Sequence, residues 1–99
     1  MNIQTLDAAS DFIDSLSIED RTKIKASLQS VILNQTAGLI IKTLKGKIKE
    51  LIVNQYRIVF FIWGNTCYVV DMFKKQSAKT PKRIIDRAEK IYQCVLKIN

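Results

Sequence analysis

The stretch that decides the fold is IKELIVNQYRIVFFIWGNTCYVVDMFKK, residues 48–75. It contains three runs rich in β-branched and aromatic residues, separated by Asn54-Gln55 and by Gly64-Asn65. Two-residue connections of this composition are typical of tight β-hairpin turns. The stretch therefore predicts three consecutive antiparallel strands, over residues 48–53, 56–63 and 66–73.

The strand register follows by counting outward from the turns, if each turn contains two residues. Ile52 then pairs with Arg57, and Arg57 pairs with Met72. Because successive side chains alternate between the faces of a sheet, one face is mainly apolar, and we expect helices to pack on it. The other face mixes apolar residues with Glu50, Arg57 and Lys74. A bulge in either hairpin would change this register.

The mixed face is a candidate site because it places two cations close together. Arg57 lies diagonal to both Glu50 and Lys74, and two cations on a partly buried face are unfavourable unless an anion joins them. The alternative is that Glu50 neutralises Arg57 while Lys74 extends into water.

Helical periodicity appears on both sides of the strands. Apolar residues recur at helical spacing over 7–16, and Ser17 then has the features of an N-cap, with Asp20 three residues later as an imperfect capping box. We expect a second helix to about Leu33, antiparallel to the first. Thr80-Pro81 predicts a C-terminal amphipathic helix, with Thr as N-cap and Pro at the first helical position.

Two segments have alternative interpretations. Residues 1–6 either form a short edge strand or lead directly into the first helix, and residues 39–44 are either a turn of helix or an extended approach to the strands. Together the elements predict a single α+β domain over residues 1–99, since a chain of 99 residues is the size of one domain.

Charge is distributed unevenly along the chain. Residues 1–41 contain five acids and three bases, a net charge of −2, whereas residues 42–99 contain thirteen bases and four acids, a net charge of +9. A half this basic favours an anionic partner such as nucleic acid, an acidic protein or a membrane surface. A solvated basic surface without a specific partner is the alternative that charge alone leaves open.

The absence of histidine excludes several kinds of chemistry. Ser-His-Asp triads, histidine metal sites and histidine acid–base catalysis all need a residue that the chain lacks. Cys67 and Cys94 are too few for a disulfide framework or a metal site, and we expect both to act as small hydrophobic residues. Catalysis must therefore use Lys, Arg, Tyr, Glu or Asp, and we expect no metal or other cofactor. A signal-peptide pattern is absent, and the longest apolar run, 58–63, is too short to cross a bilayer, which predicts a cytosolic protein.

Several short motifs in the sequence match a known family. They are Leu44-Lys45-Gly46, Glu50-Leu51, Tyr56-Arg57-Ile58, the Phe73-Lys74-Lys75 cluster, and Lys79-Thr80-Pro81. Together with a looser match in residues 11–24, they make the chain resemble the HigB-like, phage-derived branch of the RelE/ParE superfamily of toxins from type II toxin–antitoxin systems. The resemblance implies two helices packed on a small antiparallel meander, with a C-terminal helix at the edge of the sheet.

The resemblance also implies an activity, ribosome-dependent cleavage of mRNA, in which the 2′-OH of the substrate attacks the neighbouring phosphate. The mRNA is expected on a basic concave face of the sheet. Arg57 is the candidate for stabilising transition-state charge, because its guanidinium fork suits phosphate. Lys74 and Lys75 are candidates for binding phosphate or assisting proton transfer, and Glu50 is the candidate base.

Further contacts to RNA are expected from lysines before and after the strands. These lysines are Lys42, Lys45, Lys47, Lys49 and Lys79. Tyr68 or Trp63 is a candidate to stack a base, and plain core packing is the alternative for each. The chain departs from the family at Ile52, where relatives often have a basic residue, so the expected site contains one cation fewer.

The resemblance predicts the partners as well. They are the ribosome with its mRNA and a cognate antitoxin, expected to be a small helix-turn-helix protein encoded by a neighbouring gene, with no role for a membrane. Two other functions fit the same fold and charge. One is a non-enzymatic, ParE-like inhibitor of DNA gyrase, and the other is a catalytically inactive relative that binds RNA or protein.

Overall fold

The computed structural model describes residues 1–98. Within these residues there are five strands and three helices. In chain order the elements are β1 (Asn2–Thr5), α1 (Asp7–Asp14), α2 (Ile18–Ile32), β2 (Ile40–Lys45), β3 (Ile48–Val53), β4 (Tyr56–Trp63), β5 (Thr66–Lys74) and α3 (Lys82–Ile98). The predicted α+β class is confirmed.

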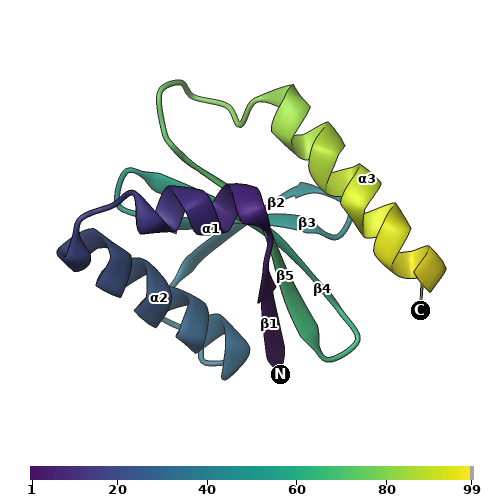
Figure 1. The fold of residues 1–99 in the computed structure, drawn as a ribbon, viewed down its shortest axis with the longest axis horizontal. Helices are drawn as coiled ribbons and strands as arrows, with labels where there is room; N and C mark the ends of the chain where they lie inside the picture. The colour runs from purple at the N-terminus through teal and green to yellow at the C-terminus, as the bar shows by residue number, and fades with distance from the viewer. Residues whose placement is uncertain (99) are drawn as a thin grey trace.

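The strands form one sheet in the order β1-β5-β4-β3-β2 (Figure 1). Strands β2 to β5 follow one another as an antiparallel meander. β1 pairs in parallel with β5, so the N-terminal residues form an edge strand, the first of their two alternatives. β2 is also extended, and the alternative of a helical turn over residues 39–44 is therefore wrong.

The three hairpin turns have the backbone conformation that their sequences favour. Gly46, Asn54 and Gly64 have φ angles of 55°, 53° and 60°. Glycine and asparagine adopt this left-handed region at low cost, and it lets a two-residue turn match the twist of the flanking strands. The ends of β3 and β4 are accordingly those predicted from the turns, while β5 extends one residue further than predicted.

A bulge in β5 makes the predicted register of the β4–β5 hairpin wrong. Near the turn the pairing is as predicted, and Phe60 pairs with Val69. One residue further from the turn, Val59 pairs with Asp71, so Val70 is the extra residue on β5. Because side chains alternate along a strand, every β5 residue beyond the bulge lies on the face opposite to the predicted one.

The bulge changes which residue lies beside Arg57. The predicted pair of Ile52 with Arg57 is confirmed, but Arg57 pairs with Phe73 and not with Met72. Met72 belongs to the core beneath α1 and α2, whereas Phe73 packs on the side of α3. Lys74 changes face in the same way, and this decides which lysine reaches the candidate site.

Both faces of the sheet are covered, by different helices (Figure 1). α1 and α2 pack on the face predicted for the helix pair. α3 lies across the other face, where Val59, Phe61 and Val70 pack against Ile84 and Ala88. The C-terminal helix is therefore over a face of the sheet and not at its edge, because its apolar stripe covers buried side chains that would otherwise contact water.

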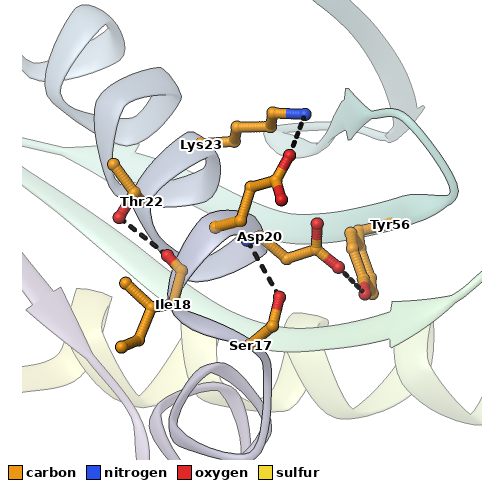
Figure 2. A network of polar contacts seen from close by, with 7 residues as sticks. Ser17, Ile18, Asp20, Thr22, Lys23 and Tyr56 are labelled. Atoms are coloured by element: carbon orange, nitrogen blue, oxygen red, sulfur yellow. Dashed lines mark hydrogen bonds and ion pairs between the residues drawn. The ribbon is translucent and has the colours of Figure 1, made fainter.

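Ser17 is the N-cap of α2, as predicted. Its hydroxyl accepts a hydrogen bond from the backbone N–H of Asp20 at 3.2 Å (Figure 2). The Asp20 carboxylate points toward the sheet, where its Oδ2 accepts a hydrogen bond from the Tyr56 hydroxyl at 2.7 Å. This bond joins α2 to β4 and, together with burial, raises the pKa of Tyr56.

The two cysteines have different environments. Cys67 is fully buried under α1 and α2, as expected of a small hydrophobic residue, and burial raises the pKa of its thiol to about 11. Cys94 is exposed, so the same expectation is wrong for it, because it lies on the side of α3 away from the apolar stripe. No helix within residues 1–98 has the length and apolar character needed to span a membrane.

Candidate functional site

A narrow cleft opens where β2, β3 and β4 meet the loop between β5 and α3. Its volume is about 70 Å³. The residues that line it are Lys42, Glu50, Ile52, Arg57, Phe73, Lys75, Ser77, Ala78, Lys79 and Thr80. Four of these side chains are cationic and one is a carboxylate, so the cleft attracts anions. We call it the basic cleft. It lies at one end of the mixed face, beyond the centre that α3 covers.

Arg57 is held in the cleft by its own hairpin turn. Its Nη1 donates hydrogen bonds to the carbonyl oxygens of Asn54 at 2.8 Å and Tyr56 at 2.9 Å. Since both bonds come from one nitrogen, the hydrogens on Nη2 and Nε remain available for an oxyanion. Within residues 1–98 Arg57 forms no ion pair, so Glu50 does not neutralise it through direct contact.

Glu50 is buried at the base of the cleft, with 3% of its surface exposed. The Thr80 hydroxyl donates a hydrogen bond of 2.6 Å to Glu50 Oε1, which fastens the loop before α3 to the sheet. Sequence reasoning identified Thr80 only as a helix signal and missed this contact, because nothing local joins residues 30 positions apart. The helix itself begins at Lys82, one residue later than predicted, and the Pro81 carbonyl accepts its first hydrogen bonds.

The β5 bulge brings Lys75 into the cleft and moves Lys74 away from it. Lys75 follows the last residue of β5, and its backbone N–H donates to the Gln55 carbonyl at 2.7 Å, so the chain still follows β4 at this point. Lys74 pairs with Tyr56 and lines a separate cavity on the other side of the loop. The predicted grouping of Arg57 with Lys74 is therefore wrong, and Lys75 is the lysine that shares the cleft with Arg57.

The lysines expected to bind RNA are divided among several places. Lys42 and Lys79 line the basic cleft. Lys45 does not, because its Nζ forms an ion pair with Glu89 of α3 at 3.0 Å, and the hydrogen bond in this pair raises the pKa of Lys45. Lys47 is exposed in the β2–β3 turn, and Lys49 shares a face with the core beneath α1 and α2. Both therefore lie outside the cleft.

Neither candidate aromatic residue lines the cleft. Tyr68 stacks on Phe61 with ring centroids 5.0 Å apart and belongs to the core on the α3 side. Trp63 meets Tyr92 edge-on at 6.3 Å. Tyr68 therefore lies outside the cleft, and its contacts are those of core packing, the alternative expected for it.

The cleft combines the groups needed to bind and react with a phosphodiester. A guanidinium and three ammonium groups can hold phosphate oxygens, and a carboxylate lies among them as a proton acceptor. Within residues 1–98 no group of three or more His, Cys, Asp or Glu residues could hold a metal ion.

Comparison with known proteins identifies the family. Residues 11–93 match the family described as "Phage derived protein Gp49-like (DUF891)". The chain belongs to the phage-derived Gp49-like family. The resemblance to the HigB-like, phage-derived branch of the RelE/ParE toxins, inferred from the short motifs, is confirmed.

Curated relatives of this Gp49-like chain come from two strains of Mycobacterium tuberculosis. Both are named "Probable endoribonuclease HigB1" and are 32% identical over an alignment of 79 residues, and the match covers 76% of this chain. The match covers 63% of each relative, so the chain spans less than two thirds of their length.

Solved structures show the same fold as this Gp49-like chain. The RelB-RelE antitoxin-toxin complex from Methanococcus jannaschii is similar with a TM-score of 0.62 and 19% identity, covering 83% of this chain and 94% of that one. A YoeB-YefM complex from Staphylococcus aureus has a TM-score of 0.61 and 17% identity, covering 78% of this chain and 98% of that one. The predicted RelE/ParE-like architecture is thereby confirmed.

Proposed function

We propose that this chain is the toxin of a type II toxin–antitoxin system and that it cleaves mRNA on the ribosome. The observation that carries the proposal is the basic cleft, in which Arg57 lies beside Glu50 and Lys75 and forms no ion pair with any residue of the described range 1–98. Family membership supports it, as do the curated relatives named as endoribonucleases. A protein that acts on translating ribosomes works in the cytoplasm.

The proposed reaction is a transesterification within the RNA. The 2′-oxygen forms a bond to the adjacent phosphorus while the bond to the 5′-oxygen of the next nucleotide breaks, giving a 2′,3′-cyclic phosphate and a 5′-hydroxyl. Glu50 accepts the proton of the 2′-OH, and the Lys75 ammonium donates a proton to the departing 5′-oxygen. Arg57 stabilises the negative charge that develops on the phosphate oxygens.

The cleft favours this function over inhibition of DNA gyrase by binding. A non-enzymatic binding surface needs no carboxylate among its cations, whereas general base catalysis does. Of the residues that line the basic cleft, Glu50 is the one acid, and burial beside Thr80 fixes its position. A catalytically inactive relative would keep the fold without this arrangement.

A toxin of this kind requires an antitoxin, and the similar solved structures are toxin–antitoxin complexes. We propose a small antitoxin encoded by a neighbouring gene, with a helix-turn-helix domain, that covers or distorts the basic cleft. Co-expression of the neighbouring gene should restore growth and yield a stable complex on purification.

The deciding experiment is induction in cells of the wild-type chain beside Arg57→Ala, with Lys23→Ala as the matched control. Lys23 is exposed on α2, which packs on the opposite face of the sheet, it does not line the cleft, and it forms an ion pair with Glu19 at 3.6 Å. Loss of one charge-stabilising donor lowers a rate by about 10²–10³-fold. We therefore expect Arg57→Ala to spare growth and mRNA, while wild type and Lys23→Ala arrest growth with cleaved mRNA.

The result that contradicts the proposal is equal growth arrest by wild type and Arg57→Ala. Growth arrest with intact mRNA contradicts it as well. In the second case, accumulation of DNA breaks or altered plasmid supercoiling would support the gyrase alternative.

A further inference from the structure

A second hollow lies on the other side of the loop that lines the basic cleft. It has a volume of about 260 Å³ and is bounded by α1, the end of β5 and the start of α3. We call it the loop cavity. Figure 1 shows the loop arching from the sheet to α3. Apolar walls come from Phe12, Phe73, Pro81 and Ile84.

The charged wall of the loop cavity consists of cations alone. Lys74, Lys79 and Arg83 line it, and no acidic residue does. Within residues 1–98 none of these three side chains forms an ion pair, whereas the neighbouring Lys82 pairs with Asp86 at 3.1 Å. Three like charges around one hollow repel each other unless an anion joins them. The cavity therefore suits a ligand with an apolar body and a negative charge.

The loop cavity and the basic cleft are neighbours. Phe73, Ser77 and Lys79 line both of them, so only the loop separates the two hollows. The cleft is lined by four cations and a carboxylate, which suit a phosphate group, whereas the loop cavity has the larger volume and four apolar walls. A nucleotide with its phosphate in the cleft therefore finds the adjacent apolar space for its base in the loop cavity.

We propose that the loop cavity binds one nucleotide of the RNA substrate, adjacent to the phosphate in the basic cleft. The base packs against Phe12 and Phe73, and its phosphate is held by Lys74 and Arg83. Unstacked bases of single-stranded RNA are commonly bound on aromatic side chains in this way, and every base offers a π-face. The identification of the ligand as RNA rests on the proposed function. The inference that the cavity binds a nucleotide does not depend on that function.

The test is an NMR titration of the full chain with adenosine 5′-monophosphate, with inorganic phosphate and adenosine as separate titrations. We expect the nucleotide to shift the ring resonances of Phe12 and Phe73 and to bind at least about fivefold more tightly than inorganic phosphate, because stacking on an aromatic ring contributes roughly a 5- to 150-fold gain. We expect it to bind at least about tenfold more tightly than adenosine, which lacks the charge-assisted hydrogen bonds of the phosphate. Unmoved phenylalanine resonances overturn the proposal. So does phosphate that binds as tightly as the nucleotide, since the cavity is then an anion site alone.

Arg83→Glu is the diagnostic variant, and Lys82→Glu is its matched control. Both residues are exposed in the first turn of α3, but only Arg83 lines the cavity. We expect Arg83→Glu to weaken nucleotide binding by at least about tenfold, from loss of a charge-assisted hydrogen bond, and Lys82→Glu to change it less than about twofold. Equal effects of the two variants overturn the proposal.

The outcome separates this inference from the proposed function. Nucleotide binding in the cavity, with no mRNA cleavage in cells, would leave the cavity as a nucleotide site and remove the nuclease reaction. Cleavage that depends on Arg57, with no nucleotide binding in the cavity, would remove this inference alone.

Discussion

The hydrogen bond from Thr80 to Glu50 should contribute measurably to the stability of the fold. Thr80→Val removes the donor while it nearly preserves the shape of the side chain. A hydrogen bond to a carboxylate contributes roughly 1.5–3 kcal/mol, and a buried acceptor that loses its partner keeps its cost of desolvation. Glu50 is 3% exposed, but the adjacent cleft admits water that can replace part of the lost bond. We therefore expect a loss of about 1.5–2 kcal/mol in the free energy of unfolding, the lower part of that range.

Urea unfolding followed by circular dichroism measures this loss of unfolding free energy directly. Thermal unfolding should show it as well: for a chain of 99 residues each kcal/mol of lost stability lowers the thermal midpoint by about 4–8 °C, so the midpoint of Thr80→Val should be about 6–16 °C lower. Thr43→Val is the matched control, because Thr43 is exposed on β2 and its side chain has no hydrogen bond within residues 1–98. The control should stay within about 0.5 kcal/mol of wild type.

A double-mutant cycle with Glu50→Gln distinguishes the hydrogen bond from other effects at Thr80. The glutamine carbonyl still accepts from the Thr80 hydroxyl, so the single variant should lose less stability than Thr80→Val. The coupling energy between the two positions should be about 0.5–1 kcal/mol, because a hydrogen bond to the neutral glutamine is roughly half as strong as one to the carboxylate. A Thr80→Val variant as stable as wild type, or a coupling near zero, would refute the argument that this bond fastens the loop.

Two further predictions concern groups with shifted pKa values. In the native protein a thiol reagent at pH 8 should modify Cys94 rapidly and Cys67 barely, since burial raises the pKa of Cys67 to about 11. Mass spectrometry should find one label on the native protein and two on the unfolded protein. Equal labelling rates of the two cysteines would contradict the prediction. Tyr56→Phe should lower the free energy of unfolding below pH 10, because it removes the hydrogen bond to Asp20. That bond raises the pKa of Tyr56 in the folded protein, so the stability it gives is lost as the tyrosine ionises. The difference in unfolding free energy between wild type and Tyr56→Phe should therefore shrink at higher pH. Urea unfolding at pH 8 and pH 11 measures the difference, and an unchanged value at pH 11 would count against it.

The strands and turns could be predicted from the sequence because local signals define them. Asn54 and Gly64 occupy turn positions with positive φ, which few other residues adopt, so the ends of β3 and β4 follow from them. Ser17 likewise marks the start of α2 through its own side chain. Such features depend on interactions within a few residues and are therefore visible in a single sequence.

The bulge at Val70 and the Thr80 contact could not be predicted in the same way. β5 is apolar on both sides in this region because helices cover both faces of the sheet, so no alternation of polar and apolar residues marks the extra residue. The position of α3 could have been predicted from the sequence. Val59 and Phe61 are apolar residues on the mixed face, and an amphipathic helix packed on that face would shield them from water. Assignment of Arg57 to the site needed only the β3–β4 hairpin, whose register lacks a bulge.

The bulge has a consequence for comparing this chain with its relatives. Lys74 and Lys75 are chemically identical neighbours, yet the extra residue in β5 gives one to the loop cavity and the other to the basic cleft. A relative that lacked the extra residue would exchange the two positions while keeping the same Phe-Lys-Lys motif. An alignment that matches lysine to lysine would then equate residues on opposite sides of the loop, and counting pairs from the β4–β5 turn is the safer guide to equivalence.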